Sequence, residues 1–407
     1  RDLVRSRGLG DVYKRQPVNG AVDFNLHGLA GVRLVDAWEK DVEAVARQLG
    51  PIRVPPQEPL SRDPEITIRF ADEQQLAPGR RADFVELGRT AFEAPTDTGF
   101  AADVGRFWVL RGKHKTPARV HIPLNEIGGS CEIVCQHGVA AVPYLIPILN
   151  LTVLANGALP LHAGAFIYEG SGALVTGWSK GGKTEALLGF MARGATYVAD
   201  EWTYLYDGGR CMSGIPEPVR IWDWHLQELP EYRERLSRGQ RMRLSTLSTV
   251  QRGLGWLAPH GGEERRTLGP LAQLHRVKPL VKKQQGVNVA PRRLFGEGRW
   301  ASSAPVDRVF FVVSSEAPEI QVRPVDPLAI AQRMVFSLQE EQRHLLSLYR
   351  QFRFAFPEAA NELIECSQQI QTTRLQEMLA GKETYAVTHP YPVPIEAMVA
   401  AMERVIR

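Results

Sequence analysis

A glycine-rich stretch with a lysine and a threonine is the part of this sequence whose residue types and spacing best suit chemistry. It consists of Gly177, Trp178, Ser179, Lys180, Gly181, Gly182, Lys183 and Thr184, which match the phosphate-loop pattern G-x-x-x-x-G-K-[ST]. A short apolar run, 173–176, precedes it, and helix-forming residues, 185–193, follow it. A strand, a glycine loop and a helix together aim main-chain N–H groups and a helix N-terminus at one anion.

We therefore expect this loop to bind the phosphates of a nucleotide. Lys183 would reach the β- and γ-phosphates, and the Thr184 hydroxyl would take a place on Mg²⁺. A glycine-rich turn ahead of a surface helix is the alternative interpretation.

Two adjacent acids follow the next predicted strand. The apolar run 196–199 ends in Asp200 and Glu201, a pattern typical of a strand whose carboxylate holds Mg²⁺ or accepts a proton. Neighbouring carboxylates repel each other unless a cation lies between them, so Mg²⁺ would account for the pair. Asp200 comes only seventeen positions after Lys183, whereas the second acid of transporter-type and recombinase-type ATPases lies much farther along. A solvated strand end is the alternative.

His162 stands near the start of a predicted hairpin. Residues 161–168 and 173–176 have strand character, with a turn at 169–172 between them, so the hairpin leads directly into the glycine loop. A half-buried strand histidine without a function is the alternative interpretation of His162.

From about Leu159 to Leu205 the sequence resembles the C-terminal domain of HPr kinase/phosphorylase, a bacterial group of P-loop kinases whose core is similar to phosphoenolpyruvate carboxykinase. The resemblance rests on the histidine, the hairpin, the glycine loop, the short helix ending in Arg-Gly, and the strand ending in Ala-Asp-acid. Four positions differ from the usual family residues: Trp178, Lys180, Thr184 and Glu201.

The resemblance implies a kinase that transfers the γ-phosphate of ATP to a hydroxyl, on a serine of a protein or peptide or on a small molecule. It implies that Asp200 is the general base and that Glu201 is a metal ligand or supports one. The expected catalytic residues are Asp200, His162 and Lys183, the expected nucleotide-binding residues are 177–184, and the expected metal ligands are Thr184, Glu201 and Asp200. ATP and Mg²⁺ are the expected cofactors. Arg220 is a further candidate for offsetting transferred charge.

Two other functions stay open at this point. One is a nucleotide-binding regulatory or assembly module with little turnover, which Trp178 and Lys180 favour slightly; the other, weaker one is a carboxykinase-like small-molecule enzyme. In the family, an acidic residue precedes a Leu-Phe-Gly run. The corresponding position here falls near Lys282, so the acid is missing, which argues against HPr itself as the acceptor. The basic segment 259–285 is either a solvated loop or a docking segment for the acceptor.

The composition is that of an ordinary soluble globular protein. The chain has 407 residues and a formal net charge of +4. Residues 1–16 resemble translated sequencing-adapter sequence and carry most of this charge, so the basic balance is no argument for nucleic-acid binding. We expect a cytoplasmic protein with no membrane partner, possible homo-oligomerisation and reduced thiols at the four scattered cysteines. The resemblance to the HPr kinase group implies a bacterial source.

The expected fold class is α/β, with a P-loop kinase core of the HPr kinase and phosphoenolpyruvate carboxykinase type. The expected divisions are 1–16 as an artefact, 17–142 as a β-rich module, 143–330 as the nucleotide-binding core and 331–407 as a helical part packed on the core. Period-two patterns predict strands at 66–70, 107–110, 119–122, 131–134, 308–313, 320–323 and 384–389, and we expect 320–323 to pair with 308–313. Helical patterns cover 36–49, 143–155, 327–356, 358–379 and 394–406.

Overall fold

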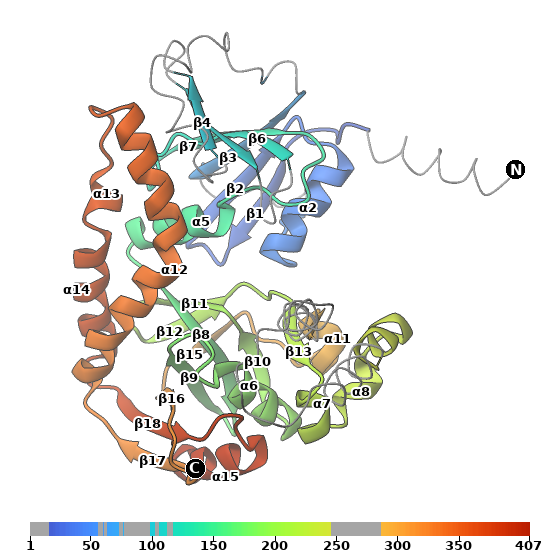
Figure 1. Ribbon diagram of the computed structural model, residues 1–407, viewed down its shortest axis with the longest axis vertical. Helices are drawn as coiled ribbons and strands as arrows, with labels where there is room; N and C mark the ends of the chain where they lie inside the picture. Colours follow the sequence, from blue (N-terminus) through green and yellow to red (C-terminus); the bar gives the residue numbers. More distant parts are fainter. Residues whose placement is uncertain are drawn as a thin grey trace, which may run out of the picture.

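The computed structural model describes residues 16–55, 60, 63–72, 76, 98–101, 106–111, 117–245 and 286–407. These residues build two large sheets and a long helical arm that runs beside both of them (Figure 1). The mixture of parallel and antiparallel strands with helices confirms the expected α/β class. Residues 1–15 and the basic segment 259–285 lie outside the described residues.

The first sheet has seven strands in the order β1-β2-β3-β7-β6-β5-β4. Their bounds are β1 Val22–Leu26, β2 Ala30–Val35, β3 Ile66–Ala71, β4 Thr98–Ala101, β5 Arg106–Arg111, β6 Pro117–His121 and β7 Cys131–Gln136. The central strands β2, β3 and β7 run parallel, and the outer pairs are antiparallel. In β3, Ile66, Ile68 and Phe70 are buried and Arg69 is exposed, which is the predicted alternation. Helix α5 (Leu145–Ala155) contacts both β2 and helix α2 (Glu39–Leu49).

The start of this unit differs from the sequence prediction in two ways. Strands β1 and β2 were not predicted, because their short apolar runs lie close to glycines. The helix predicted from Asp36 begins only at Glu39. Asp36 has a φ of +56°, which no helix tolerates, and the Asp41 carboxylate accepts the N–H of Trp38 at the true helix start.

Two of the four cysteines lie on strand β7. Cys131 and Cys135 are both fully buried, and burial raises the pKa of the Cys131 thiol to about 12 and that of Cys135 further. Thiols with a raised pKa stay protonated and unreactive near neutral pH. We therefore interpret both as core residues of the first sheet.

The second sheet has nine strands and carries the glycine loop. Its path is β15-β12-β11-β8-β9-β16-β18-β17, and β10 also pairs with β8. The bounds are β8 Leu159–Tyr168, β9 Ser171–Gly177, β10 Thr196–Ala199, β11 Trp202–Tyr206, β12 Cys211–Gly214, β15 Ser303–Pro305, β16 Arg308–Ser314, β17 Gln321–Pro324 and β18 Glu383–His389. Strands β9, β16 and β18 are parallel, so their carboxyl ends meet at one edge. The predicted hairpin is confirmed as β8 and β9.

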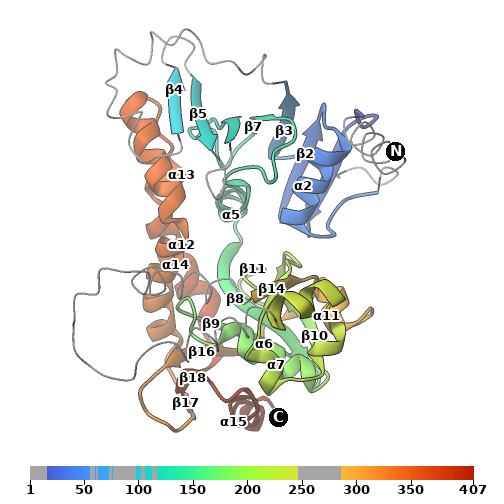
Figure 2. The same ribbon diagram turned by 45° about the vertical axis from the view of Figure 1, so that its right-hand side comes forward.

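Helices cover the second sheet, and a small ribbon lies beside it (Figure 2). The helices are α6 Lys183–Ala192, α7 His225–Glu228, α8 Tyr232–Arg235, α11 Pro291–Phe295 and α15 Ile395–Ile406. The ribbon pairs β13 (Val219–Trp222) with β14 (Gly286–Val289). Helix α6 packs against β8, β9 and α15, and its buried Leu187 and Phe190 join one core with Phe310 of β16. The loop helix is therefore held between two layers.

The helical arm consists of α12 (Pro327–Ala355), α13 (Glu362–Glu365) and α14 (Ser367–Leu379). Helix α12 packs along α14 and also contacts β8 and β9. The Asn361 amide donates to the carbonyls of Leu124 and Ile127, which ties the arm to the first unit. The second helix, predicted as continuous, is interrupted at Cys366. Among the described helices, not one combines the length and the apolar character that crossing a bilayer requires.

One predicted strand pairing is wrong. The segment 320–323 was expected beside 308–313, but β17 pairs with β18. Strand β16 has both of its edges occupied by parallel partners, β9 on one side and β18 on the other. Strand β18 confirms the strand predicted at 384–389, and it lies beside β16 in the second sheet.

Candidate phosphate-binding site

The glycine loop leaves the carboxyl end of β9 and enters helix α6. Its first glycine, Gly177, has a φ of +152°, and a Cβ there would lie 2.4 Å from the carbonyl oxygen of Val312 in the neighbouring strand β16. Only glycine therefore allows the loop to leave the sheet at this point. Gly182 has a φ of +102° and precedes the first residue of α6. These positions explain the two glycines that the pattern requires.

The loop combines a buried floor with an exposed rim. Gly181, Gly182 and Lys183 are buried, whereas Trp178, Ser179 and Lys180 are exposed. Lys180 has a φ of +65°, a left-handed conformation that is uncommon for a residue with a side chain. The side chains of Trp178, Ser179 and Lys180 are therefore open to solvent at the outer edge of the loop.

Lys183 is turned back over the loop. Its Nζ donates to the carbonyl oxygens of Gly177 (3.2 Å) and Trp178 (2.9 Å). Burial lowers the pKa of Lys183, while the charges of Glu201 and Asp200 act in the opposite direction. The ammonium is thus hydrogen-bonded to the loop backbone and attracted by the two nearby carboxylates.

The structure brings Thr184 and Asp200 together. The Thr184 hydroxyl lies 3.2 Å from Asp200 Oδ1 and 3.3 Å from Oδ2, although the two residues come from α6 and from the end of β10. Burial raises the pKa of Asp200 to about 7, and the charge of Glu201 adds to this; His162, Thr184 and Lys183 act against it. A hydroxyl and a carboxylate placed this close together are the protein groups that hold Mg²⁺ in magnesium–nucleotide sites.

The described residues contain no group of three histidine, cysteine or acidic side chains spaced to hold a metal. Magnesium bound with a nucleotide takes most of its six ligands from phosphates and water, and one or two from protein. Thr184 and Asp200 supply oxygen donors of the kind that Mg²⁺ prefers, and Glu201 offers another. The donor set therefore suits a magnesium ion that arrives with phosphate.

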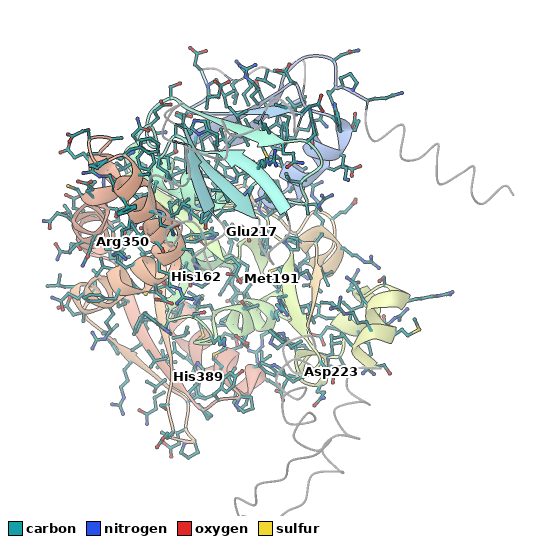
Figure 3. The ribbon with its side chains drawn as sticks, turned by 45° about the horizontal axis from the view of Figure 1, so that its top comes forward. His162, Met191, Glu217, Asp223, Arg350 and His389 are labelled. Atoms are coloured by element: carbon teal, nitrogen blue, oxygen red, sulfur yellow. The ribbon has the colours of Figure 1, made fainter. Side chains whose placement is uncertain are left out.

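His162 lies between two carboxylates from distant parts of the chain. Its Nε2 is 3.0 Å from Glu201 Oε2, and its Nδ1 is 2.8 Å from Oε1 of Glu341 on α12. The second contact is an ion pair rather than a well-aligned hydrogen bond. Burial lowers the pKa of His162, but the interactions with Glu201 and Glu341 outweigh it, so the pKa is raised. Figure 3 shows His162 near the centre of the molecule, beside the helical arm.

Glu201 adopts a backbone conformation that is rare for its residue type. Its φ is +70°, and its side chain is about half exposed, with an exposed fraction of 51%. Left-handed backbone at a residue with a Cβ costs about 1–2 kcal/mol and is concentrated at functional sites. The turn aims the Glu201 carboxylate at His162 while Asp200 points toward Thr184. The two predicted acids therefore face different partners.

Sequence reasoning missed Glu341 and His389. Glu341 follows the spacing of the buried residues Met334, Leu338 and Leu345 of α12, so a charged residue on an apolar helix face was the available signal. His162 lowers the pKa of Glu341, which is consistent with a paired carboxylate. Arg220, a predicted candidate, is exposed on β13 and lies over the ring of Trp222 at 4.5 Å.

We expect Glu341→Gln to lower the pKa of His162, because the variant loses one of two negative charges beside the ring. The folded-state pKa of His162 lies above the ordinary value of 6.5. The His162 charge therefore stabilises the fold below about pH 6.5, and this contribution is lost as the pH rises through the raised pKa. Histidine proton resonances titrated in EDTA, with unfolding at about pH 6 and about pH 8, measure both effects.

The matched control for this prediction is Glu340→Gln, one residue earlier on α12. Glu340 pairs with Arg343 at the surface and does not face His162. An unchanged His162 titration in Glu341→Gln, or an equal shift in both variants, would show that the ion pair does not hold the charge of the ring.

Comparisons with known proteins add little. No family model matches the sequence, and no curated protein matches it. Among solved structures, the HPr(Ser) kinase/phosphatase from Coxiella burnetii aligns with 60% of this chain and 96% of its own, at 11% identity and a TM-score of 0.24. A TM-score of this size does not establish a shared fold.

Proposed function

We propose that this protein is an ATP- and magnesium-dependent kinase that transfers the γ-phosphate to a hydroxyl group. The observation that carries the proposal is the pairing of the Thr184 hydroxyl with Asp200 at the mouth of a loop whose glycines and lysine match the phosphate-loop pattern. We further propose that 143–330 is a P-loop kinase core, that 17–142 is an N-terminal β-rich module, and that 331–407 is a helical part packed on the core.

The proposed reaction follows from what each group can do. The loop N–H groups and the Lys183 ammonium bind the phosphate oxygens and stabilise the charge that develops in the transition state. Asp200 accepts the proton of the acceptor hydroxyl, whose oxygen forms a bond to the γ-phosphorus. The bond from that phosphorus to the β–γ bridging oxygen breaks, and ADP leaves with the electron pair. A pKa of about 7 suits a proton acceptor that works near neutral pH.

Magnesium would be held by Thr184, with Asp200 or Glu201 as a further donor, and would neutralise charge on the β- and γ-phosphates. His162 stands next to Glu201 as a raised-pKa, largely buried imidazole. Its positive form would limit the repulsion between Glu201 and Glu341 near the transferred phosphoryl group. The acceptor class that we propose is a hydroxyl, on serine of a protein or peptide or on a small molecule.

The test uses the purified protein, γ-³²P-ATP and excess Mg²⁺ or EDTA. We expect magnesium-dependent ATP binding by calorimetry and label transfer to a serine-containing peptide library or to a metabolite extract. Tight ATP binding without transfer to either, or to water, would favour the regulatory module instead. A lack of magnesium-dependent binding to ATP and to GTP would overturn both functions.

A further inference from the structure

A buried histidine lies directly under the phosphate loop. His389 ends strand β18 and has no exposed surface. Its Nε2 is 2.7 Å from the carbonyl oxygen of Gly181, and its Nδ1 is 2.9 Å from that of Pro390. The His389 carbonyl in turn accepts the N–H of Ser315 at 2.7 Å, which fixes the residue at the strand end. Figure 3 shows that His389 lies well away from His162.

The His389 ring touches the loop at the peptide between its last two glycines. A Cβ on Gly182 would lie 2.7 Å from Nε2 and 3.1 Å from Cε1 of His389. The histidine ring therefore occupies the space that a side chain at position 182 would need. This contact joins the C-terminal strand β18 to a loop about 200 residues earlier in the chain.

The hydrogen bond to Gly181 sets the direction of that peptide. In a trans peptide the carbonyl and the following N–H point in opposite directions. With the Gly181 carbonyl held toward His389, the Gly182 N–H points away from the ring, at the N-terminus of α6. A Gly-Gly peptide has little intrinsic preference for this orientation, because neither residue carries a Cβ that would oppose a flip.

We propose that His389 is a positioning residue that holds the Gly181–Gly182 peptide with its N–H directed at the phosphates of the ligand. The donor in this contact is the ring N–H at Nε2, because the Gly181 carbonyl oxygen can only accept. Because the ring is fully buried, its proposed role is to act through the loop backbone. The consequence for ligand affinity rests on the proposed function, whereas the orientation of the peptide does not.

The experiment compares His389→Phe, which keeps a ring but cannot donate, with His389→Gln, which retains a donor N–H. His225→Phe is the matched control, because His225 is also fully buried and pairs with Glu185 of α6 without bonding the loop. Two measurements are made on the full chain: hydrogen–deuterium exchange of peptides covering 177–184, and calorimetric binding of inorganic tripolyphosphate with Mg²⁺.

In His389→Phe we expect about 10-fold faster exchange in the loop and about 10- to 100-fold weaker tripolyphosphate binding, the effect of losing one or two hydrogen bonds. His389→Gln should recover part of both, and His225→Phe should change neither beyond what its melting temperature explains. Wild-type exchange and affinity in His389→Phe would overturn the proposal, as would equal losses in His225→Phe or an absence of recovery in His389→Gln.

The two measurements separate the inference from the function on which it builds. If the wild-type protein binds no tripolyphosphate, the proposed function fails, and the exchange comparison alone decides whether His389 orders the loop. If the wild-type protein binds tripolyphosphate and His389→Phe binds it equally well, the function stands and the positioning role is wrong.

Discussion

Lys183→Ala is expected to reduce kcat/KM for ATP-dependent transfer about 100- to 1,000-fold, the range found when one donor to developing charge is removed. Lys183 is a buried ammonium beside the loop, held by the carbonyls of Gly177 and Trp178 and attracted by Asp200 and Glu201. When the γ-phosphoryl group is transferred, negative charge spreads over its oxygens. Alanine at this position leaves that charge without the Lys183 ammonium.

The control for Lys183→Ala is Lys382→Ala, because Lys382 also donates to a main-chain carbonyl, that of Val306, away from the loop. Initial rates of label transfer and ATP titrations by calorimetry give kcat/KM and affinity separately. We expect both to fall in Lys183→Ala and neither to change by more than about 3-fold in Lys382→Ala, as for a substitution outside the site. Equal activity of Lys183→Ala and Lys382→Ala would show that Lys183 takes no part in the mechanism.

The part of the site that the sequence predicts is the part that is local in the chain. Strand, turn, strand, glycine loop and helix follow one another without a break from His162 to the end of α6, and each has its own pattern of apolar and glycine residues. The structure places them as the patterns indicate, with β8 and β9 paired and the loop at the strand end. Thr184 and Asp200 meet because β10 returns beside β8, which carries His162.

The part that could not be predicted is long-range. Glu341 and His389 reach the site from α12, which packs against the second sheet, and from β18, which is one of its strands. No local pattern predicts where α12 packs or which strands β18 lies between. For the same reason the pairing of β17 was wrong, since a strand of four residues carries no signal for its neighbour. A charged residue on an apolar helix face was the one sequence signal that pointed to Glu341.

Asp200→Asn is expected to lower the rate of phosphoryl transfer about 100- to 10,000-fold, which is the usual contribution of a positioned general acid or base. The asparagine amide has nearly the shape of the carboxyl group but cannot accept a proton from the acceptor hydroxyl. The burial that raises the pKa of Asp200 to about 7 is the same property that makes it a competent proton acceptor. ATP affinity in excess Mg²⁺ should change by less than about 3-fold, because loop N–H groups and Lys183 provide most of that binding.

Glu201→Gln separates the roles of the two adjacent acids, with Asp307→Asn as a control for carboxylate loss elsewhere in the core. Asp307 accepts the N–H of Gly172, outside the site. If Asp200 is the base, its variant stays slow at every magnesium concentration, whereas Glu201→Gln needs more magnesium but regains its rate when magnesium is raised. The reverse pattern, with Asp200→Asn rescued by magnesium, would make Asp200 the metal ligand. That outcome would fit the contact between Asp200 and the Thr184 hydroxyl. It would assign proton acceptance to Glu201, whose half-exposed carboxylate is hydrogen-bonded to His162.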